Sequence, residues 1–264
     1  MENLKNTLKA HFVSTSKPEH IWFFGDSFIS NPNGWVQGIA TKTNYTYTNK
    51  GLCGASLHHL YNSVTSNWHL FREDSIVIIA LTDIKRLWLL PAEPSIGTFG
   101  NYEERLAEDP DTMQFVQRHF TEWYNEELLL SYLIMFLTSL EAKTSHLKIK
   151  PIILPCFSAT TNILNTMPPL DLHIATGDLS FVSKNELTEG ANKELGKFTY
   201  DWRSNHLSIP NHTILCNKLL DFITTGNQID LNSDFKSNFL SAKEFGSPPD
   251  LNLLEMLRCG KREN

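Results

Sequence analysis

Three segments of this chain contain the residue types that nucleophilic acyl chemistry requires. Such chemistry needs a nucleophile, a base that takes its proton, a partner that orients the base, and donors for the developing oxyanion. Ser27 offers a hydroxyl, His206 offers an imidazole that titrates near neutral pH, and the glycine-containing segment Gly51–Ser56 offers backbone N–H groups. The serine and the histidine stand near opposite ends of the chain, so the fold must bring them together.

Ser27 directly follows an apolar run. Ile21-Trp22-Phe23-Phe24 is continuous, aromatic and β-branched, which predicts a strand covered on both faces, and it stops at Gly25-Asp26-Ser27. Open α/β sheets place ligands just beyond the carboxyl ends of their strands, where a helix amino end also offers N–H groups to an anion. The alternative is ordinary turn and helix-cap chemistry, for which Gly-Asp-Ser is equally suited.

His206 lies in the segment Asp201–Ser208, just before the predicted helix 212–224. An imidazole at this place can serve as a general base. Its neighbours include Asp201 and Asn205, which are candidates to orient the imidazole and to take part in substrate binding. The alternative is that His206 only marks the entry to the helix.

Two further strand ends are expected to supply donors. Gly51 and Gly54 follow the predicted second strand and allow the backbone to approach a ligand closely, although a plain strand-to-helix turn fits them equally well. The third predicted strand ends in Thr82 and Asp83, so these side chains are expected at the same sheet edge. The expected oxyanion and substrate-binding residues are Gly54, Thr82, Asp83, Asp26 and Asn205.

The elements that must position these residues alternate between strand and helix. Strands are predicted at 20–24, 45–48, 75–81 and 150–156, and helices at 35–43, 56–66, 112–142 and 212–224. Such alternation predicts an α/β fold, with a central parallel sheet between two helical layers. We expect one domain over residues 1–225. After it the sequence turns polar, so residues 226–264 are expected to be an extension, either an arm or partly disordered.

The composition excludes several classes of protein. The 264 residues are 41% hydrophobic with a net charge of -6, which fits a globular domain and lacks the basic face of a nucleic-acid binder. The four cysteines are widely spaced and are expected to be reduced thiols. We predict no metal site and no cofactor. The amino terminus does not read as a secretory signal, and the apolar stretch 128–140 is too short to span a bilayer, so a soluble cytoplasmic protein is expected.

In this order, the segments resemble the GDSL/SGNH hydrolase superfamily over roughly residues 18–225. Phe24-Gly25-Asp26-Ser27 is similar to its first block, Asn49–Gly54 to its second, and Asp201–His206 to its last. The resemblance implies the flavodoxin-like SGNH hydrolase fold. It also implies that Ser27 is the nucleophile and that Gly54 is the oxyanion glycine.

Two departures from the family pattern bear on activity. The third block of the family has an asparagine that donates to the oxyanion, whereas here the segment reads Leu81-Thr82-Asp83, so only Thr82 could donate from this strand end. Loss of one such donor costs about 10²–10³ in rate. The family's acid lies three residues before the histidine; that position is Arg203 here, so Asp201 or a backbone carbonyl must orient His206. These variant blocks resemble those of virus- and phage-encoded members.

The resemblance implies a serine esterase that removes short acyl groups such as acetyl, including O-acetyl groups on carbohydrates. Its partner would be a small-molecule or carbohydrate ester. Two alternatives remain open. In the first alternative, the chain is a binding or structural module that keeps the fold without the catalysis. In the second, it is an acyltransferase that uses the same residues. The sequence does not predict an oligomeric state.

Overall fold

The chain folds around a five-stranded parallel sheet in the order β2-β1-β3-β4-β5. The structure is a computed structural model that describes residues 20–30, 34–52, 54–73, 75–86, 114, 117–118, 122, 125–147, 149, 151–180, 182, 207 and 209–236. The strands are β1 (His20–Gly25), β2 (Thr46–Gly51), β3 (Ser75–Leu81), β4 (Ile152–Pro155) and β5 (His173–Ile174). This strand order is the flavodoxin-like one, in which ligands bind beyond the carboxyl ends of the strands.

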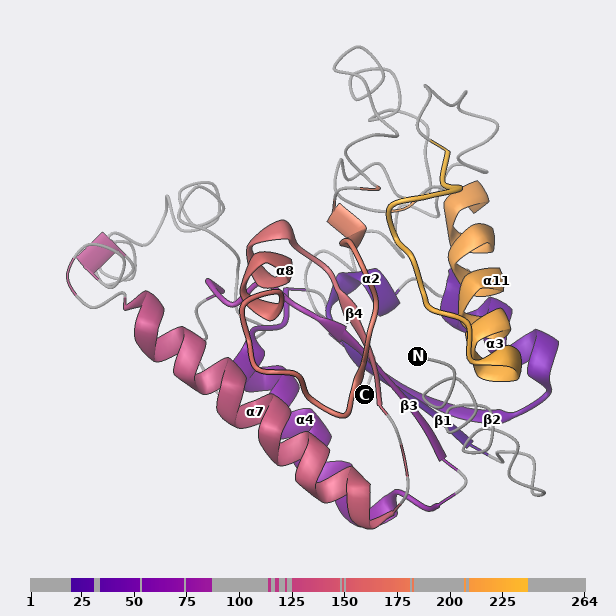
Figure 1. The fold of residues 1–264 in the computed structure, drawn as a ribbon, viewed down its shortest axis with the longest axis horizontal. Helices are drawn as coiled ribbons and strands as arrows, with labels where there is room; N and C mark the ends of the chain where they lie inside the picture. Colours follow the sequence, from indigo (N-terminus) through magenta and orange to yellow (C-terminus); the bar gives the residue numbers. More distant parts are fainter. Residues whose placement is uncertain are drawn as a thin grey trace.

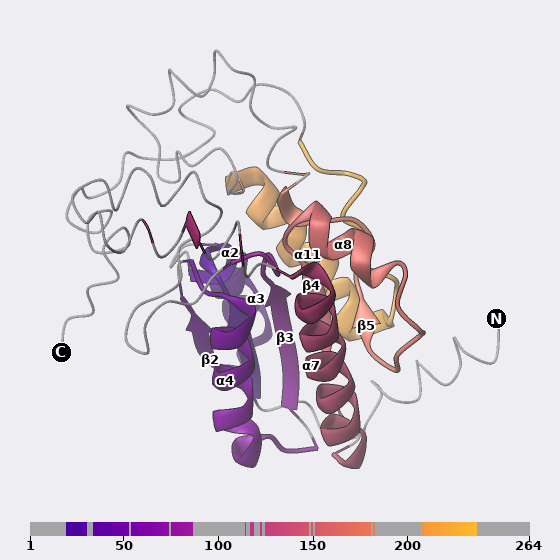
Figure 2. The same cartoon turned by 90° about the vertical axis from the view of Figure 1, so that its left-hand side faces the viewer.

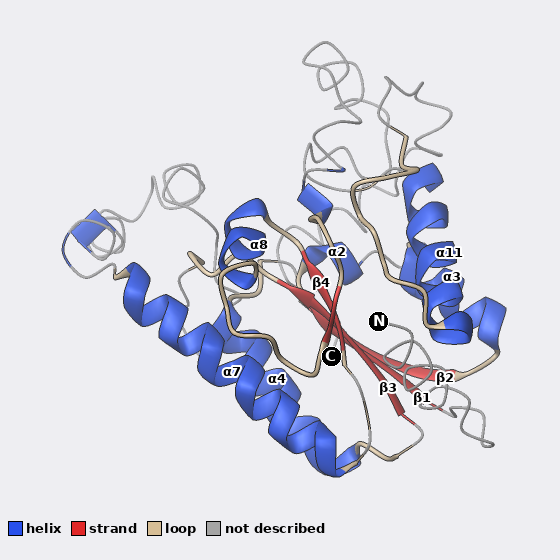
Figure 3. Ribbon diagram, viewed as in Figure 1, coloured by secondary structure: helices blue, strands red, loops and turns tan. Residues whose placement is uncertain are grey.

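Helices cover both faces of the sheet (Figures 1 and 3). They are α2 (Ser27–Ser30), α3 (Trp35–Thr43), α4 (Leu57–Asn67), α7 (Glu126–His146), α8 (Ser158–Leu164) and α11 (Ile209–Thr225), with a 3₁₀ turn η1 (Trp68–Leu70) after α4. Helices α3 and α11 pack against each other on one face, and α4 and α7 lie on the other. The predicted three-layer α/β/α fold with a parallel sheet is confirmed.

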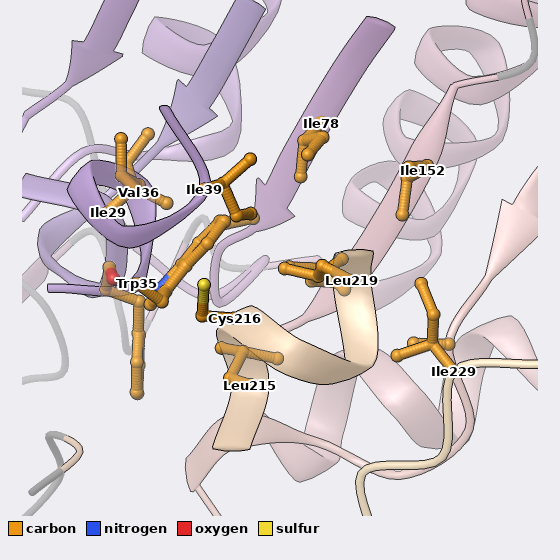
Figure 4. Packing of buried hydrophobic residues seen from close by; sticks show 14 of the residues in the cluster. Ile29, Trp35, Val36, Ile39, Ile78, Ile152, Leu215, Cys216, Leu219 and Ile229 are labelled. Carbon is orange, nitrogen blue, oxygen red and sulfur yellow. Dashed lines mark hydrogen bonds between the residues drawn. The ribbon is translucent and has the colours of Figure 1, made fainter. Parts of the chain in front are cut away.

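Alternating side chains of each central strand supply the two halves of the core. In β1, Ile21 and Phe23 pack with the cluster of α3 and α11, whereas Trp22 and Phe24 pack with the cluster of α4 and α7. All four are 6% exposed or less, as expected for a strand with helices on both sides. Figure 4 shows the first cluster, where Trp35 of α3 meets the apolar side chains of α11 beneath the strands.

The predicted elements differ from the structure mainly at short segments and boundaries. Strand β3 and helix α3 match their predicted ranges, while α7 begins later than predicted because Asn125 caps it by accepting a hydrogen bond from the Leu128 N–H. Strand β5 was not predicted, because only His173 and Ile174 pair with β4.

Residues just beyond α11 pack on the sheet's last strand. Ile229 and Leu231 are 2% and 1% exposed, and Asp230 forms a bridge with Thr176. The boundary between 225 and 226 stays a prediction, as does the character of the remaining extension. None of the described helices combines the length and hydrophobicity that a bilayer span needs.

Gly25, at the end of β1, is fixed by the close approach of β3. Its φ is +157°, and a Cβ placed there would lie 2.7 Å from both the Cβ and the carbonyl oxygen of Ala80. No side chain at this position can avoid the neighbouring backbone. Gly226, just after α11, provides a contrast, because its φ is +73° but nothing lies within 4 Å of an added Cβ.

Gly25→Ala is expected to lower the free energy of unfolding by about 3 kcal/mol, from the steric clash plus backbone strain. Gly226→Ala is the matched control and should cost only about 1 kcal/mol, because it carries the strain without the clash. Chemical denaturation followed by circular dichroism measures both values. Equal losses in the two variants would contradict the contact between β1 and β3 that we describe.

Candidate active site

Ser27 is the first residue of α2 and follows β1 after a single residue, Asp26. Figure 2 shows α2 at the end of the sheet toward which β3 points, which is the carboxyl edge. The turn forms because Asp26 caps the short helix: its Oδ1 accepts a hydrogen bond from the Phe28 N–H at 3.0 Å, and its carbonyl accepts one from the Ile29 N–H at 3.2 Å. Ser27 is 5% exposed, so the hydroxyl lies in a nearly closed environment.

Asp26 is fully buried and carries the ion pair of this edge. Its Oδ2 lies 2.8 Å from Arg86 Nη1 and 3.0 Å from Thr82 Oγ1. A buried carboxylate requires such partners, because an unpaired buried charge is costly. Asp26 therefore has a structural role next to Ser27. Both oxygens of its carboxylate accept hydrogen bonds from protein donors.

The hydroxyl of Thr82 is used inside the protein. Thr82 is fully buried, and its Oγ1 lies 2.9 Å from the Ala55 carbonyl oxygen in addition to its contact with Asp26. Because a hydroxyl has one proton, it donates to one of these acceptors at a time. Thr82 thus ties the end of β3 to the segment after Gly54.

The glycine turn after β2 lies beside the end of β1. The Leu52 N–H donates to the Gly25 carbonyl at 3.1 Å, and the Ala55 N–H donates back to Leu52 at 3.0 Å. Gly54 has a φ of 74°, in the left-handed region that favours glycine. The turn that contains Gly54 is therefore bonded to the end of β1 through the Leu52 N–H.

Asp83 closes a turn after β3. Its Oδ1 accepts a hydrogen bond from the Lys85 N–H at 2.9 Å, and its carbonyl accepts one from the Arg86 N–H at 3.3 Å. This side-chain-to-backbone bond is typical of an aspartate at a turn. The turn directs Arg86 back toward the end of β1.

His206, Asp201 and Asn205 lie outside the described residues. The next residue, Leu207, is described and is only 2% exposed. It belongs to the same apolar cluster as Phe28 and Ile29, which follow Ser27 in α2. Leu207 itself thus lies on the same face of the sheet as α2.

The first turn of α11 is also connected to α2. The Nδ1 atom of buried His212 accepts a hydrogen bond from the Trp35 N–H at 3.4 Å, and the Trp35 indole N–H donates to the Phe28 carbonyl at 2.9 Å. This path leads from the start of the last helix to the residue after Ser27. The Nδ1 atom of His212 is thus engaged by the backbone of α3.

Sequence reasoning did not single out Arg86 and Phe157. Arg86 Cζ lies 4.8 Å from the centre of the Phe157 ring, and that ring meets Phe28 edge-on at 5.8 Å between ring centres. Both residues follow strand ends, Arg86 after β3 and Phe157 after β4. The Asp26–Arg86 pair could have been predicted from the positions of an acid just after β1 and a cation shortly after β3, because both strands end at the same edge of the sheet.

Cys156, at the end of β4, is the other nucleophile type near this edge. Complete burial raises the pKa of the Cys156 thiol well above its usual value, and the Asp26 charge raises it further. The thiol therefore stays protonated and unreactive. Among the described residues, no group of histidines, cysteines and carboxylates is placed to hold a metal ion.

Comparison with known proteins gives similarity to solved structures alone: no family model and no curated protein matches the chain. The psychrotrophic esterase EstA from Pseudoalteromonas sp. aligns over 79% of this chain and 98% of its own, with 11% identity and a TM-score of 0.45. A G-D-S-L family protein from Desulfitobacterium hafniense DCB-2 aligns over 56% of this chain and 66% of its own, with 18% identity and a TM-score of 0.30. With identities and TM-scores this low, functional inference depends on the residues themselves.

Proposed function

We propose that this chain is a serine ester hydrolase. Ser27 Oγ attacks the acyl carbon while His206 takes its proton. The backbone N–H groups of Ser27 and Gly54 stabilise the oxyanion, and His206 returns the proton to the leaving alcohol. Water, activated by the same imidazole, then hydrolyses the acyl-enzyme. Asp201 orients His206, and Asn205 and Asp83 contribute to substrate binding.

The observation that carries this proposal is the position of Ser27. It is the first residue of a helix, at the carboxyl end of a buried parallel strand, and is held there by the buried Asp26. A hydroxyl at this place lies at the sheet edge where open α/β sheets bind their ligands. The glycine turn that ends in Gly54 is bonded to the same strand end through Leu52.

The proposed contact between Ser27 and His206 is supported by described residues that follow each of them in the chain. Leu207 is buried in the cluster that includes Phe28, and His212 is linked to Phe28 through Trp35. These contacts bring the segment after His206 to the residues after Ser27. They support a pair in which an imidazole reaches the serine hydroxyl.

The burial of the proposed nucleophile supports a short acyl group. Ser27 is only 5% exposed, which favours a short acyl group such as acetyl over a bulky one. We propose acetyl esters of small molecules or of carbohydrates as the substrate class. The buried Thr82 hydroxyl is bound to Asp26 and Ala55, so we assign it to holding the site together.

The purified protein should hydrolyse p-nitrophenyl acetate and release acetate from an O-acetylated sugar. The rate should rise with pH through about 6.5, because the base must be neutral to accept a proton and an unperturbed histidine titrates there. Release of p-nitrophenol measures the first reaction across the pH range. A folded protein that releases no more product than buffer would contradict the proposal.

A catalytically silent binding module is the second candidate. The observation that favours it is the absence of an asparagine after β3, where the Thr82 hydroxyl is instead bound within the protein. Such a module would bind an acetylated sugar without hydrolysing it. An acyltransferase would use the same residues, and product analysis with an added acceptor alcohol distinguishes acyl transfer from hydrolysis.

A further inference from the structure

Arg86 is a nearly buried cation at the candidate site. Its side chain is 9% exposed, and its Nη1 atom contacts two acceptors: Asp26 Oδ2 at 2.8 Å and the Ala55 carbonyl oxygen at 3.2 Å. The guanidinium also stacks over the Phe157 ring at 4.8 Å. These contacts fix the cation from three directions, between the ends of β1, β3 and β4.

The two acceptors belong to the two segments that must supply the oxyanion donors. Asp26 directly precedes Ser27, and Ala55 directly follows Gly54. An oxyanion hole works only when its donors are fixed before the reaction, and a misplacement of about 1 Å can lower a rate about 10²-fold. A group that bonds both segments therefore controls the geometry of the hole.

Arg86 can hold both segments simultaneously, whereas Thr82 cannot. Each terminal guanidinium nitrogen carries two N–H groups, so Nη1 can donate to Asp26 and to Ala55 together. The Thr82 hydroxyl contacts the same two acceptors but has one proton to give. The permanent positive charge of Arg86 also balances the buried carboxylate that caps α2.

We infer that Arg86 is a positioning residue, which locks the Ser27 turn to the Gly54 turn through Nη1 and so fixes the spacing of the two oxyanion donors. This inference rests on the proposed ester hydrolysis by Ser27. It assigns to Arg86 no contact with the substrate. The residue acts on the reaction through Asp26 and Ala55.

Arg86→Met should lower kcat for p-nitrophenyl acetate by about 10²-fold with KM little changed, since the acyl group still binds but its oxyanion is poorly held. Arg86→Lys should recover part of the loss, because an ammonium also has more than one proton to donate. Lys85→Met is the matched control. It removes the neighbouring cation, which is 41% exposed and paired with exposed Glu126, and should leave kcat unchanged.

The double variant Asp26→Asn/Arg86→Met separates positioning from stability. It removes both buried charges, so thermal unfolding should return toward that of the wild type, while kcat should stay low because the bond to Ala55 is still missing. Recovery of both properties would show a purely structural ion pair and overturn the inference. This variant also carries the test if Arg86→Met does not fold.

The outcomes separate this inference from the proposed function. Wild-type turnover together with an undiminished kcat in folded Arg86→Met would overturn the role of Arg86 alone. Absence of wild-type turnover would overturn the proposed function, and the role of Arg86 with it.

Discussion

The Ser27→Ala variant is expected to lose hydrolysis of p-nitrophenyl acetate by on the order of 10⁴-fold or more while keeping its fold. The serine hydroxyl is the group that forms the acyl-enzyme, and its removal leaves only the binding and oxyanion contributions. Alanine fits the helical position, so the thermal unfolding curve should change little. Initial rates at saturating substrate, compared with the uncatalysed reaction, measure the loss.

Ser30→Ala is the control for this experiment. Ser30 is the last residue of α2, and its hydroxyl donates to the Ser27 carbonyl oxygen at 3.2 Å. The substitution thus removes a hydroxyl from the same helix and leaves the proposed nucleophile in place, so most of the activity should remain. Equal losses in the two variants would point to damage to α2 as a whole and away from nucleophilic attack by Ser27.

His206→Ala is expected to lower the same rate by at least about 10³-fold and to abolish its rise with pH near 6.5. Both effects follow if the imidazole takes the serine proton, because the base must be neutral to accept it. His69→Ala is the control, since His69 is exposed in η1, beyond the far end of α4. It should retain the rate and the pH profile of the wild type.

Combining the two changes tests whether the residues act as a unit. In a nucleophile–base pair, loss of either member disables the other, so the effects of the two substitutions are far from additive. Ser27→Ala/His206→Ala should therefore be no slower than Ser27→Ala alone. A further large loss in the double variant would mean that His206 contributes by a route that does not involve Ser27.

Sequence patterns predicted the elements whose signals are local. Ser75–Leu81 is an almost unbroken β-branched run, and it forms β3 over the predicted range. The range Trp35–Thr43 also matched, because its apolar residues recur at helical spacing and Asn44 ends the helix in a left-handed conformation. Buried strands and amphipathic helices of this length reveal themselves without knowledge of their neighbours.

Elements that depend on a neighbour were not predicted. His173 and Ile174 form a strand only because β4 lies beside them. Neither residue is fully buried, and a run of two residues is too short to show the apolar pattern of a central strand. The four residues of α2 are too few for any periodicity. The helix begins at the cap formed by Asp26. The sequence indicated possible cap chemistry at Gly25-Asp26-Ser27, but it did not predict a helix over residues 27–30.

The chemistry of the site was predictable in kind but not in pairing. A serine after β1 and glycines after β2 stood out because of their positions at strand ends. The ion pair between Asp26 and Arg86 did not, because it depends on β1 and β3 lying side by side in the register Phe24 to Ile79. The Thr82 hydroxyl, which the sequence analysis proposed as an oxyanion donor, is bound to Asp26 and to the Ala55 carbonyl at the same sheet edge.

The most direct measurement is the location of a fluorophosphonate adduct on the full chain by peptide mass spectrometry. The phosphonate reacts with an activated hydroxyl, which displaces fluoride and gives its proton to the base. The account predicts one adduct, on Ser27, formed rapidly in the wild type and far more slowly in His206→Ala. An adduct on another residue, or none on the folded wild-type protein, would contradict it.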